Sequence, residues 1–404
     1  MLDVYVHEQL AGTLTREGRE HVFTYHTDNP ELFVSLTMPV RQKSYVYQGE
    51  QLHPVFNMFI PEGYLFDLFR TMLAKKMDTI NELKLLTVLA PGIRGRLTFR
   101  PRQRPDSDWL VPGSTESISL NDLLAAPDDI FGRLLELFLY RSAISGAQPK
   151  VLGSLRDKTA LTLDDYIIKT YGPEYPDLTE NEFFCLSAAR AAGIAVPEFW
   201  LSDSKRLLII KRFDTKDATG MDLGFEEVCG LTGKSSQRKY EGSYEQIARC
   251  LTSFVSPAHR SAALEQLYKT LVLSVLIRNG DAHLKNFGVL YSNGAADARL
   301  APAYDLVTTS CYIRNDVPAL QLSGRKDWWS RKKLLDFGQL HCQLSGSTAR
   351  SLFELCVHAV DRTRQELRSY ISENPGFALT GSSMLKTWEA SLRASGCGGM
   401  HEPA

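Results

Sequence analysis

The stretch Arg278-Asn279-Gly280-Asp281-Ala282-His283-Leu284-Lys285-Asn286-Phe287-Gly288 decides how the fold of this chain is interpreted. Before it, over residues 262–278, apolar residues recur at intervals of three and four, which is typical of a helix with one wide buried face. Gly280 allows a turn, a dense polar loop follows, and residues 288–291 resemble a short strand. A rigid helix that leads into a polar loop is a common way to position chemically active side chains.

The polar loop carries the residue types that phosphoryl transfer requires. Asp281 can orient an attacking hydroxyl and accept its proton, and Asn286 offers an oxygen ligand to magnesium, a hard cation. The Asp-x-x-x-x-Asn spacing between them is the spacing of the protein-kinase catalytic loop. Asp305 follows after a hairpin-like segment as a second carboxylate for magnesium. Lys285 can stabilise the charge that develops on the transferred phosphoryl group.

Upstream residues fit a nucleotide site. Lys169 ends a short apolar strand, where a lysine can grip nucleotide phosphates, and Glu182 on the next predicted helix can pair with it. Arg212 and Phe213 end a second strand, at the position of a hinge beside the adenine base. The candidate loop over the phosphates consists of Ser145, Gly146, Ala147, Gln148, Pro149 and Lys150, and its single glycine makes it a weak signal by itself. The set predicts ATP and magnesium as cofactors.

Each of these residues also has an ordinary structural interpretation. Asp281 alone would more often be a turn residue or a helix cap. Lys169 alone would be a solvated lysine at a strand end, and Glu182 the capping-box partner of a helix N-cap at Thr179. His283 is expected to be structural rather than a metal ligand, because no second His or Cys nearby completes a zinc set. The functional interpretation is favoured because the parts follow one another in the order that a kinase requires.

Three segments with different patterns follow one another along the chain. Residues 1–105 mix strand and helix patterns, residues 106–214 are rich in strand patterns, and residues 215–404 are mainly helical. The expected strands are 2–6, 34–38, 96–99, 165–170 and 206–213, and the expected helices are 64–76, 179–192, 262–278 and 349–370. Proline and glycine among charges at 100–119 predict a linker. This order predicts an α+β fold with a small N-terminal α+β subdomain, a β-rich nucleotide-binding lobe and an α-helical catalytic lobe.

The composition argues against several classes of protein. The 404 residues include 46 basic and 47 acidic side chains, a net charge of −1, unlike a protein that coats nucleic acid or an anionic membrane. No apolar run approaches the roughly 20 residues of a membrane span, and the N-terminus lacks the pattern of a signal peptide. The seven cysteines show no Cys-x-x-Cys spacing, as expected of reduced thiols. A cytoplasmic protein without membrane contact is expected.

One basic and aromatic segment, residues 325–333, allows two interpretations. It can be a charged loop that Trp328 and Trp329 anchor in the core, or a contact surface for an acidic protein or a nucleic acid. The balanced net charge favours the first interpretation.

These motifs resemble those of the HipA toxin kinases, the serine/threonine kinases of bacterial type II toxin–antitoxin pairs. The resemblance covers nearly the whole chain. Residues 10–14 and 90–96 look like the N-terminal subdomain of that family, and residues 144–150 look like its phosphate loop. The later matches are Ile168-Lys169, Asn181-Glu182, residues 211–214, residues 279–286 and residues 302–305. The resemblance implies a two-lobed, protein-kinase-like (HipA-like) fold.

The resemblance also implies roles for individual residues. Asp281 would accept the proton, Asn286 and Asp305 would bind magnesium, and Lys169 would bind phosphate. The nucleotide site would further include the phosphate loop, Lys211, Arg212, Phe213, His283, Lys285 and Tyr304. The family phosphorylates itself on a serine of the phosphate loop, which ejects the loop and silences the enzyme. Ser145 or Ser142 would serve here, because Ala143 stands at one of the usual serine positions, and the added phosphate would repel the nucleotide phosphates.

The partners implied are those of the family. Its members inactivate an aminoacyl-tRNA synthetase, so that translation and growth stop, and a helix-turn-helix antitoxin of the HipB type neutralises them. That antitoxin binds the DNA of the operon. The present sequence shows no helix-turn-helix pattern, so DNA would be contacted only through the antitoxin.

Two other functions are compatible with the same motifs. A small-molecule kinase of the aminoglycoside-phosphotransferase type shares the Asp, Asn and Asp arrangement, but does not need the extra unit at residues 1–100. A non-catalytic regulatory module could keep the fold. Intact Lys169, Asp281, Asn286 and Asp305 argue against it.

Overall fold

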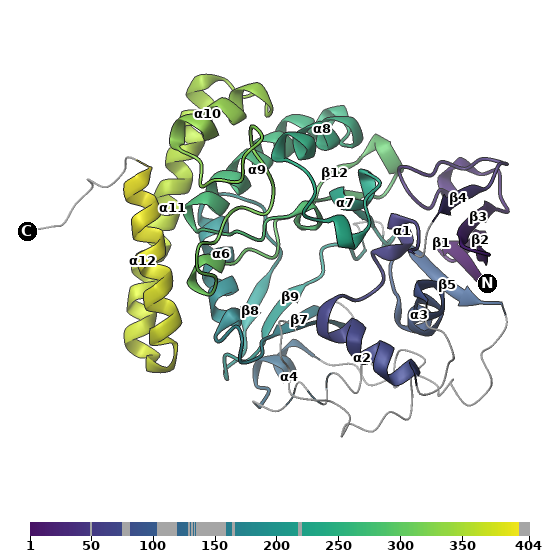
Figure 1. Cartoon of the computed structure of the whole chain (residues 1–404), viewed down its shortest axis with the longest axis horizontal. Helices are drawn as coiled ribbons and strands as arrows, with labels where there is room; N and C mark the ends of the chain where they lie inside the picture. The colour runs from purple at the N-terminus through teal and green to yellow at the C-terminus, as the bar shows by residue number, and fades with distance from the viewer. Residues whose placement is uncertain are drawn as a thin grey trace, which may run out of the picture.

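The computed structural model describes residues 1–48, 51–74, 81–102, 119–127, 159–163, 166–216 and 220–395, together with positions 130, 132 and 134. An N-terminal sheet lies at the opposite end of the molecule from the last two long helices, and a second sheet lies between them (Figure 1). The predicted order of a mixed N-terminal unit, a strand-rich region and a helical region is confirmed in these residues.

The N-terminal unit is built on an antiparallel sheet of five strands in the order β4-β3-β2-β1-β5. The strands are β1 (Leu2–Val6), β2 (Gln9–Glu17), β3 (Glu20–Tyr25), β4 (Tyr45–Gln48) and β5 (Leu97–Pro101). His7 and Glu8, both at positive φ, form the two-residue turn between β1 and β2, which matches the right-handed twist of a hairpin. The helices of this unit are α1 (Pro54–Asn57), α2 (Gly63–Ala74) and α3 (Glu82–Leu89), and their apolar residues share a core with the sheet.

The predicted strand at residues 34–38 is wrong. Ser35 and Met38 form an isolated bridge within a tight turn, in which the Met38 N–H donates to the Ser35 carbonyl at 2.9 Å. A buried carboxylate distant in sequence, Glu226, accepts hydrogen bonds from the Ser35 hydroxyl at 2.6 Å and from the Leu36 N–H at 2.7 Å. This tertiary contact takes the Leu36 N–H, which a strand would use in its ladder, and holds the turn against Glu226.

The second sheet has four antiparallel strands in the order β6-β7-β9-β8. The strands are β6 (Thr159–Leu163), β7 (Tyr166–Thr170), β8 (Phe199–Leu201) and β9 (Leu208–Lys211). In β9, Leu208 and Ile210 face the core of the helical region, whereas Ile209 faces the core of the N-terminal unit. Strand β9 is therefore buried on both faces and joins the two cores. Helix α4 (Leu120–Leu124) contributes Leu123 to the N-terminal core.

Helix α6 (Leu178–Ala191) confirms the predicted helix after β7, but its predicted cap is wrong. The N-cap is Asp177, which has a φ of 57° and makes no side-chain capping bond. The Thr179 hydroxyl instead donates to the Lys205 carbonyl at 2.6 Å. Glu182, predicted as an alternative to be the capping partner of Thr179, pairs with Lys169. Gly193, at a φ of 63°, follows the end of the helix as predicted.

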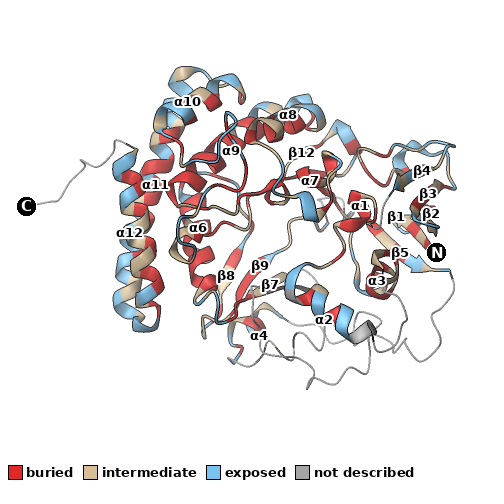
Figure 2. Cartoon of the chain, viewed as in Figure 1, coloured by how far each residue is buried: buried red, intermediate tan, exposed pale blue. Residues whose placement is uncertain are grey.

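The remaining chain forms a small sheet and the long helices. The three strands β10 (Gly224–Glu227), β11 (Gly288–Tyr291) and β12 (Arg299–Leu300) are antiparallel. The helices are α7 (Val228–Leu231), α8 (Tyr244–Phe254), α9 (Pro257–Leu276), α10 (Arg331–Leu340), α11 (Gly346–Glu373) and α12 (Ala378–Ala394). Most of α9 is buried, whereas α11 and α12 expose one face (Figure 2). The predicted helices at 262–278 and 349–370 are confirmed as α9 and α11.

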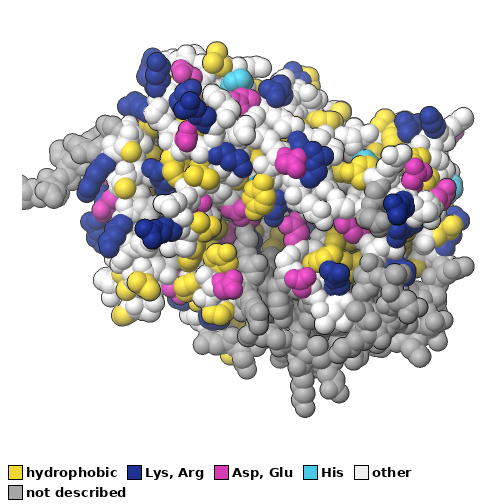
Figure 3. All heavy atoms as spheres, in the orientation of Figure 1, with side chains coloured by type: hydrophobic (Ala, Val, Ile, Leu, Met, Phe, Trp, Pro, Cys, Tyr) yellow, Lys and Arg dark blue, Asp and Glu magenta, His cyan; other side chains and the backbone are white. Residues whose placement is uncertain are grey.

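The segment 325–333 is anchored as the first interpretation predicted. Trp329 is buried in the main core, and the Trp328 indole N–H donates to the Asp316 carbonyl at 2.8 Å. Basic and acidic side chains are interspersed on the face of the molecule shown in Figure 3. The six cysteines of the described part are free thiols. No helix in that part is long and apolar enough to span a membrane.

Candidate active site

The polar loop after α9 is held in place by its own side chains. The Asn279 carboxamide oxygen accepts from the Asp281 N–H at 3.1 Å, and the Asn286 oxygen accepts from the His283 N–H at 2.8 Å. A Cβ on Gly280 would lie 2.3 Å from a carboxylate oxygen of Asp316, so this position excludes a side chain. These contacts fix the backbone on both sides of the Asp281 carboxylate.

Lys169 is the centre of a polar network that joins three elements. Its ammonium donates to Glu182 Oε1 at 2.6 Å and to Asp305 Oδ1 at 2.9 Å. The other oxygen of Asp305 accepts from the Asn286 amide at 2.9 Å. The side chain of Glu182 is 3% exposed, so its charge is almost fully desolvated and depends on Lys169 for compensation. Strand β7, helix α6, the polar loop and the segment after β12 thus converge on one site.

Asp305 has a left-handed backbone at a φ of 57°, which is costly for a residue with a side chain and is concentrated at functional sites. Asn181 fixes the chain just beyond it. The Asn181 oxygen accepts from the Thr308 N–H at 2.8 Å, and its amide donates to the Thr308 carbonyl at 3.1 Å. Because Asn181 and Glu182 are neighbours on α6, one helix turn positions both Asp305 and Lys169.

Lys285 lies between two carboxylates. Its ammonium pairs with Glu62, which precedes α2 of the N-terminal unit, and lies 3.5 Å from Glu227 at the end of β10. Burial would lower the pKa of Lys285, but the two carboxylates outweigh it and raise that pKa. Burial would raise the pKa of Glu62, but Lys285 and Lys239 lower it below its usual value. Both groups are therefore charged at neutral pH, and the N-terminal unit contacts the polar loop directly.

The predicted hinge residues take different positions. Phe213 stacks on Tyr304 with ring centroids 5.4 Å apart, and the Tyr304 hydroxyl donates to the Lys285 carbonyl at 2.6 Å. Arg212 donates to both oxygens of Asp214 at 2.9 Å. Lys211 instead pairs with Glu198 at 2.6 Å at the exposed end of β9. Phe213 and Tyr304 thus form an aromatic wall next to Asp305, whereas the ammonium of Lys211 is directed to the surface carboxylate.

Asn286 and Asp305 are the residues of this site that suit a metal ion. A carboxylate and an amide oxygen are hard donors of the kind magnesium takes, usually completed by substrate phosphates and water. In the described part of the chain, no group of three or more His, Cys, Asp or Glu side chains is placed to hold a metal. His283 is buried, and its ring packs against the Tyr240 ring in a T-shaped arrangement with the centroids 5.1 Å apart.

Not every predicted residue falls in the described structure. Ser142 and the loop from Ser145 to Lys150 lie outside the described residues. The residues of the site that were not predicted include Glu62 and Tyr240. The Tyr240 hydroxyl donates to Asp281 Oδ1 at 2.9 Å. No local spacing indicates either residue, because each contacts a loop distant in sequence.

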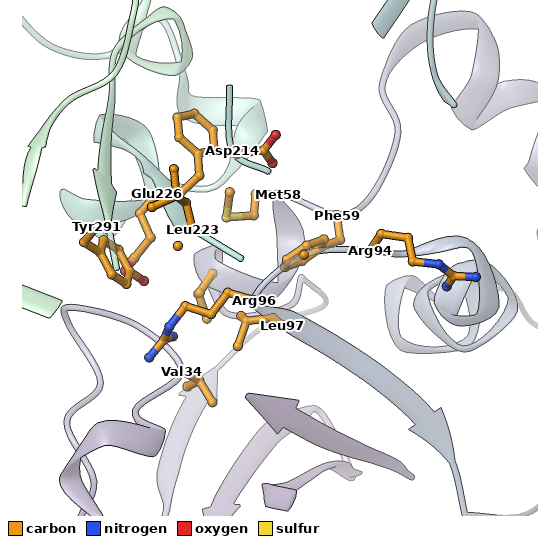
Figure 4. Close-up of a pocket in the computed structure, with 14 residues that line it drawn as sticks. Val34, Met58, Phe59, Arg94, Arg96, Leu97, Asp214, Leu223, Glu226 and Tyr291 are labelled. Carbon is orange, nitrogen blue, oxygen red and sulfur yellow. The ribbon is translucent and has the colours of Figure 1, made fainter. Parts of the chain in front are cut away.

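A cavity of about 50 Å³ lies beside this site, between the N-terminal unit and β10 and β11. Arg96, Glu226 and Tyr291 line one side of it, and the side chain of Arg94 points away (Figure 4). Lys169, Asp281, Asn286 and Asp305 do not line it. The cavity belongs to the interface between the two parts of the molecule.

Comparisons with known proteins show what this chain is similar to. A family model described as the HipA-like C-terminal domain matches residues 142–364, and one described as the HipA N-terminal domain matches residues 2–100. A Sinorhizobium fredii protein provisionally named kinase Y4dM is 29% identical over 354 residues, which cover 81% of each chain. A Haemophilus influenzae protein, also provisionally named a kinase, is 28% identical over 205 residues, 46% of this chain and 59% of its own.

One solved structure matches along the full length of both chains, with a TM-score of 0.69 and 18% identity. It is the Shewanella oneidensis toxin–antitoxin complex of HipA, HipB and operator DNA. The likeness shows that the fold is shared, and the predicted two-lobed kinase-like fold is confirmed.

Proposed function

Because the chain belongs to the HipA family, we propose that it is an ATP- and magnesium-dependent protein kinase that phosphorylates serine or threonine. The observation that carries this proposal is the network in which Lys169 bridges Glu182 and Asp305, and Asp305 meets Asn286. A lysine paired with a helix glutamate, beside a carboxylate and an asparagine that can hold magnesium, is the arrangement that kinases use.

Each residue of the site has its own role in the proposed phosphoryl transfer. Lys169, oriented by Glu182, binds the nucleotide phosphates. Asn286 and Asp305 hold magnesium, which when bound neutralises charge on the phosphates. Phe213 and Tyr304 offer an apolar surface to the adenine base. In the structure described above, the ammonium of Lys169 compensates the charge of Asp305.

Asp281 acts on the acceptor. It orients the acceptor hydroxyl and takes its proton as the oxygen bonds to the γ-phosphorus and the bond to the departing ADP breaks. Lys285 lies in the same loop, and its positive charge stabilises the transferring group. Glu62 and Glu227 keep that lysine charged and hold it in place.

We further propose that this kinase is the toxin of a toxin–antitoxin pair. Its protein substrate would be an aminoacyl-tRNA synthetase, and its partner a helix-turn-helix antitoxin of the HipB type, through which alone it meets DNA. Self-phosphorylation at Ser142 or Ser145 would silence it. The matched complex with HipB and operator DNA supports the partner, and the N-terminal unit supports a HipA-type kinase over a small-molecule phosphotransferase. The boundaries near residues 105 and 214 belong to the same proposal.

Intact-mass spectrometry tests the kinase chemistry. The purified chain is incubated with ATP and magnesium, beside an Asp281→Asn variant that keeps the size of the side chain but not its basicity. A gain of one phosphoryl group by the wild type alone, mapped to Ser142 or Ser145, is expected.

The same samples separate the competing functions. Nucleotide binding is followed by titration with ATP and magnesium. If ATP binds but the mass does not increase, the enzyme does not phosphorylate itself. Aminoglycosides and a purified synthetase are then tried as acceptors. If ATP does not bind, the chain is a non-catalytic module and the proposed kinase function is wrong.

A further inference from the structure

Tyr240 lies where an acceptor would be expected. Its hydroxyl donates to Asp281 Oδ1 at 2.9 Å, which is the hydrogen bond that a serine or threonine hydroxyl makes to a catalytic base before transfer. The residue is 45% exposed, so no packed core holds the side chain in this position. Its ring packs in a T-shaped arrangement against the ring of His283, a residue of the same loop as Asp281, with the centroids 5.1 Å apart.

The backbone beside Tyr240 is fixed to the catalytic loop. The Lys239 carbonyl accepts from the Leu284 N–H at 3.2 Å, and the Lys239 ammonium donates to Glu62 at 2.8 Å. A short distance along the chain, the buried Tyr244 hydroxyl donates to the Ala282 carbonyl at 2.9 Å. The segment therefore follows the loop on both sides of Tyr240, whose exposed side chain can leave without moving these anchors.

We propose that Tyr240 is the acceptor-site residue of this enzyme, whose hydroxyl occupies the acceptor position at Asp281 until a substrate hydroxyl displaces it. The inference rests on the proposed kinase function. In the resting state the phenol satisfies Asp281 and keeps water from the position of the nucleophile. A protein acceptor replaces one hydrogen bond to Asp281 with another, so its exchange costs little. Water makes only that one hydrogen bond, whereas a protein acceptor is also held by contacts outside this position. The tethered phenol therefore excludes water more effectively than it excludes the acceptor, and hydrolysis of ATP is suppressed.

Hydrolysis of ATP without a protein acceptor measures this competition, because water is then the only free nucleophile. Release of free phosphate is followed as an initial rate, before self-phosphorylation silences the enzyme, for the wild type and for Tyr240→Phe. The variant keeps the ring and its contact with His283 but lacks the hydroxyl. We expect its hydrolysis rate to rise by about three- to tenfold, the range that the loss of one hydrogen bond allows. Adding Asp281→Asn to it should abolish the gain.

The matched control is Tyr45→Phe, which removes an exposed hydroxyl that donates to the Pro39 carbonyl in the N-terminal unit. Its hydrolysis rate should equal that of the wild type. An unchanged or lower rate for Tyr240→Phe, or an equal rise in the control, overturns the inference even when the wild type binds ATP and turns it over through Asp281. If no variant binds ATP with magnesium, the proposed kinase function fails, and the acceptor role fails with it.

Discussion

The carboxylate of Glu182 is nearly desolvated, and it forms a close ion pair with the ammonium of Lys169 at 2.6 Å. Removing one partner of a buried ion pair leaves an uncompensated charge, which is costly. Lys169 has a second partner in Asp305, so its ammonium would stay compensated without Glu182. What would be lost is its position midway between helix α6 and Asp305.

We therefore predict that Glu182→Gln weakens the binding of ATP with magnesium by about 10- to 100-fold, as a lost hydrogen bond to a charged group implies. Lys169 would pair with Asp305 alone and compete with magnesium for that carboxylate. Titration of the purified variant with nucleotide gives the affinity. Glu366→Gln is the control, because Glu366 forms an exposed pair with Arg362 on α11. Equal affinity in both variants would show that Lys169 does not need Glu182.

At the level of residues, the sequence predicted the parts of the site whose spacing is local or whose order along the chain is diagnostic. The Asp281 and Asn286 spacing is local, and Lys169, Glu182 and Asp305 follow in the expected order. Glu62 could not be predicted, because its partner Lys285 is 223 positions away. Only the folded arrangement brings these two side chains together.

Helix α6 carries a second buried carboxylate, on the side that faces α11. The Tyr370 hydroxyl donates to Glu180 at 2.8 Å, and Glu180 is 4% exposed. Burial, with a smaller contribution from Asp177, raises the pKa of Glu180 from 4.5 to about 7, although Tyr370 and Lys205 oppose it. The folded chain therefore holds a proton here that the unfolded chain releases at lower pH.

A pH dependence of stability follows from this carboxyl group. Its pKa is higher in the folded than in the unfolded chain, so its contribution is favourable below pH 4.5 and is lost as the pH rises toward 7. The unfolding free energy of the wild type should therefore fall between pH 5 and pH 8. We predict that this fall is smaller in Glu180→Gln by up to roughly 3 kcal/mol. Urea unfolding at both pH values measures this difference. Parallel curves for the two proteins would contradict the shifted pKa.

Elements with a long apolar period were predictable, and those fixed by tertiary contacts were not. Helices α9 and α11 bury a continuous stripe, so their pattern is visible in the sequence. The start of α6 was misplaced because Thr179 bonds to the Lys205 carbonyl instead of capping the helix. The segment at 34–38 has the alternation of a strand, but Glu226 accepts from its Leu36 N–H and Ser35 hydroxyl and holds it in a turn.

In the whole molecule, the N-terminal unit and the helical region act as parts of one structure. Strand β9 contributes residues to both cores, and Glu62 reaches the polar loop. Glu226 on β10 is the main polar link, because it accepts from Ser35 and Leu36 of the N-terminal unit and from the Tyr291 hydroxyl at 2.8 Å. Burial raises the pKa of Glu226, although these donors oppose the shift. A change at this carboxylate should therefore affect the docking of the whole N-terminal unit.

We predict that Glu226→Ala lowers the unfolding free energy by about 2–4 kcal/mol, because two buried donors and one half-buried donor lose their acceptor and the adjacent cavity admits water to satisfy only some of them. Glu226→Gln keeps one carbonyl acceptor and should cost about 1 kcal/mol. Urea unfolding gives both values, and Glu366→Ala on the exposed face of α11 serves as the control. Hydrogen exchange then locates the effect. Faster exchange in β1 to β5 with little change in α9 would show that the N-terminal unit loosens first. Uniform acceleration across both regions would instead mean that the two parts unfold only together, so that this link contributes to global stability but does not control docking.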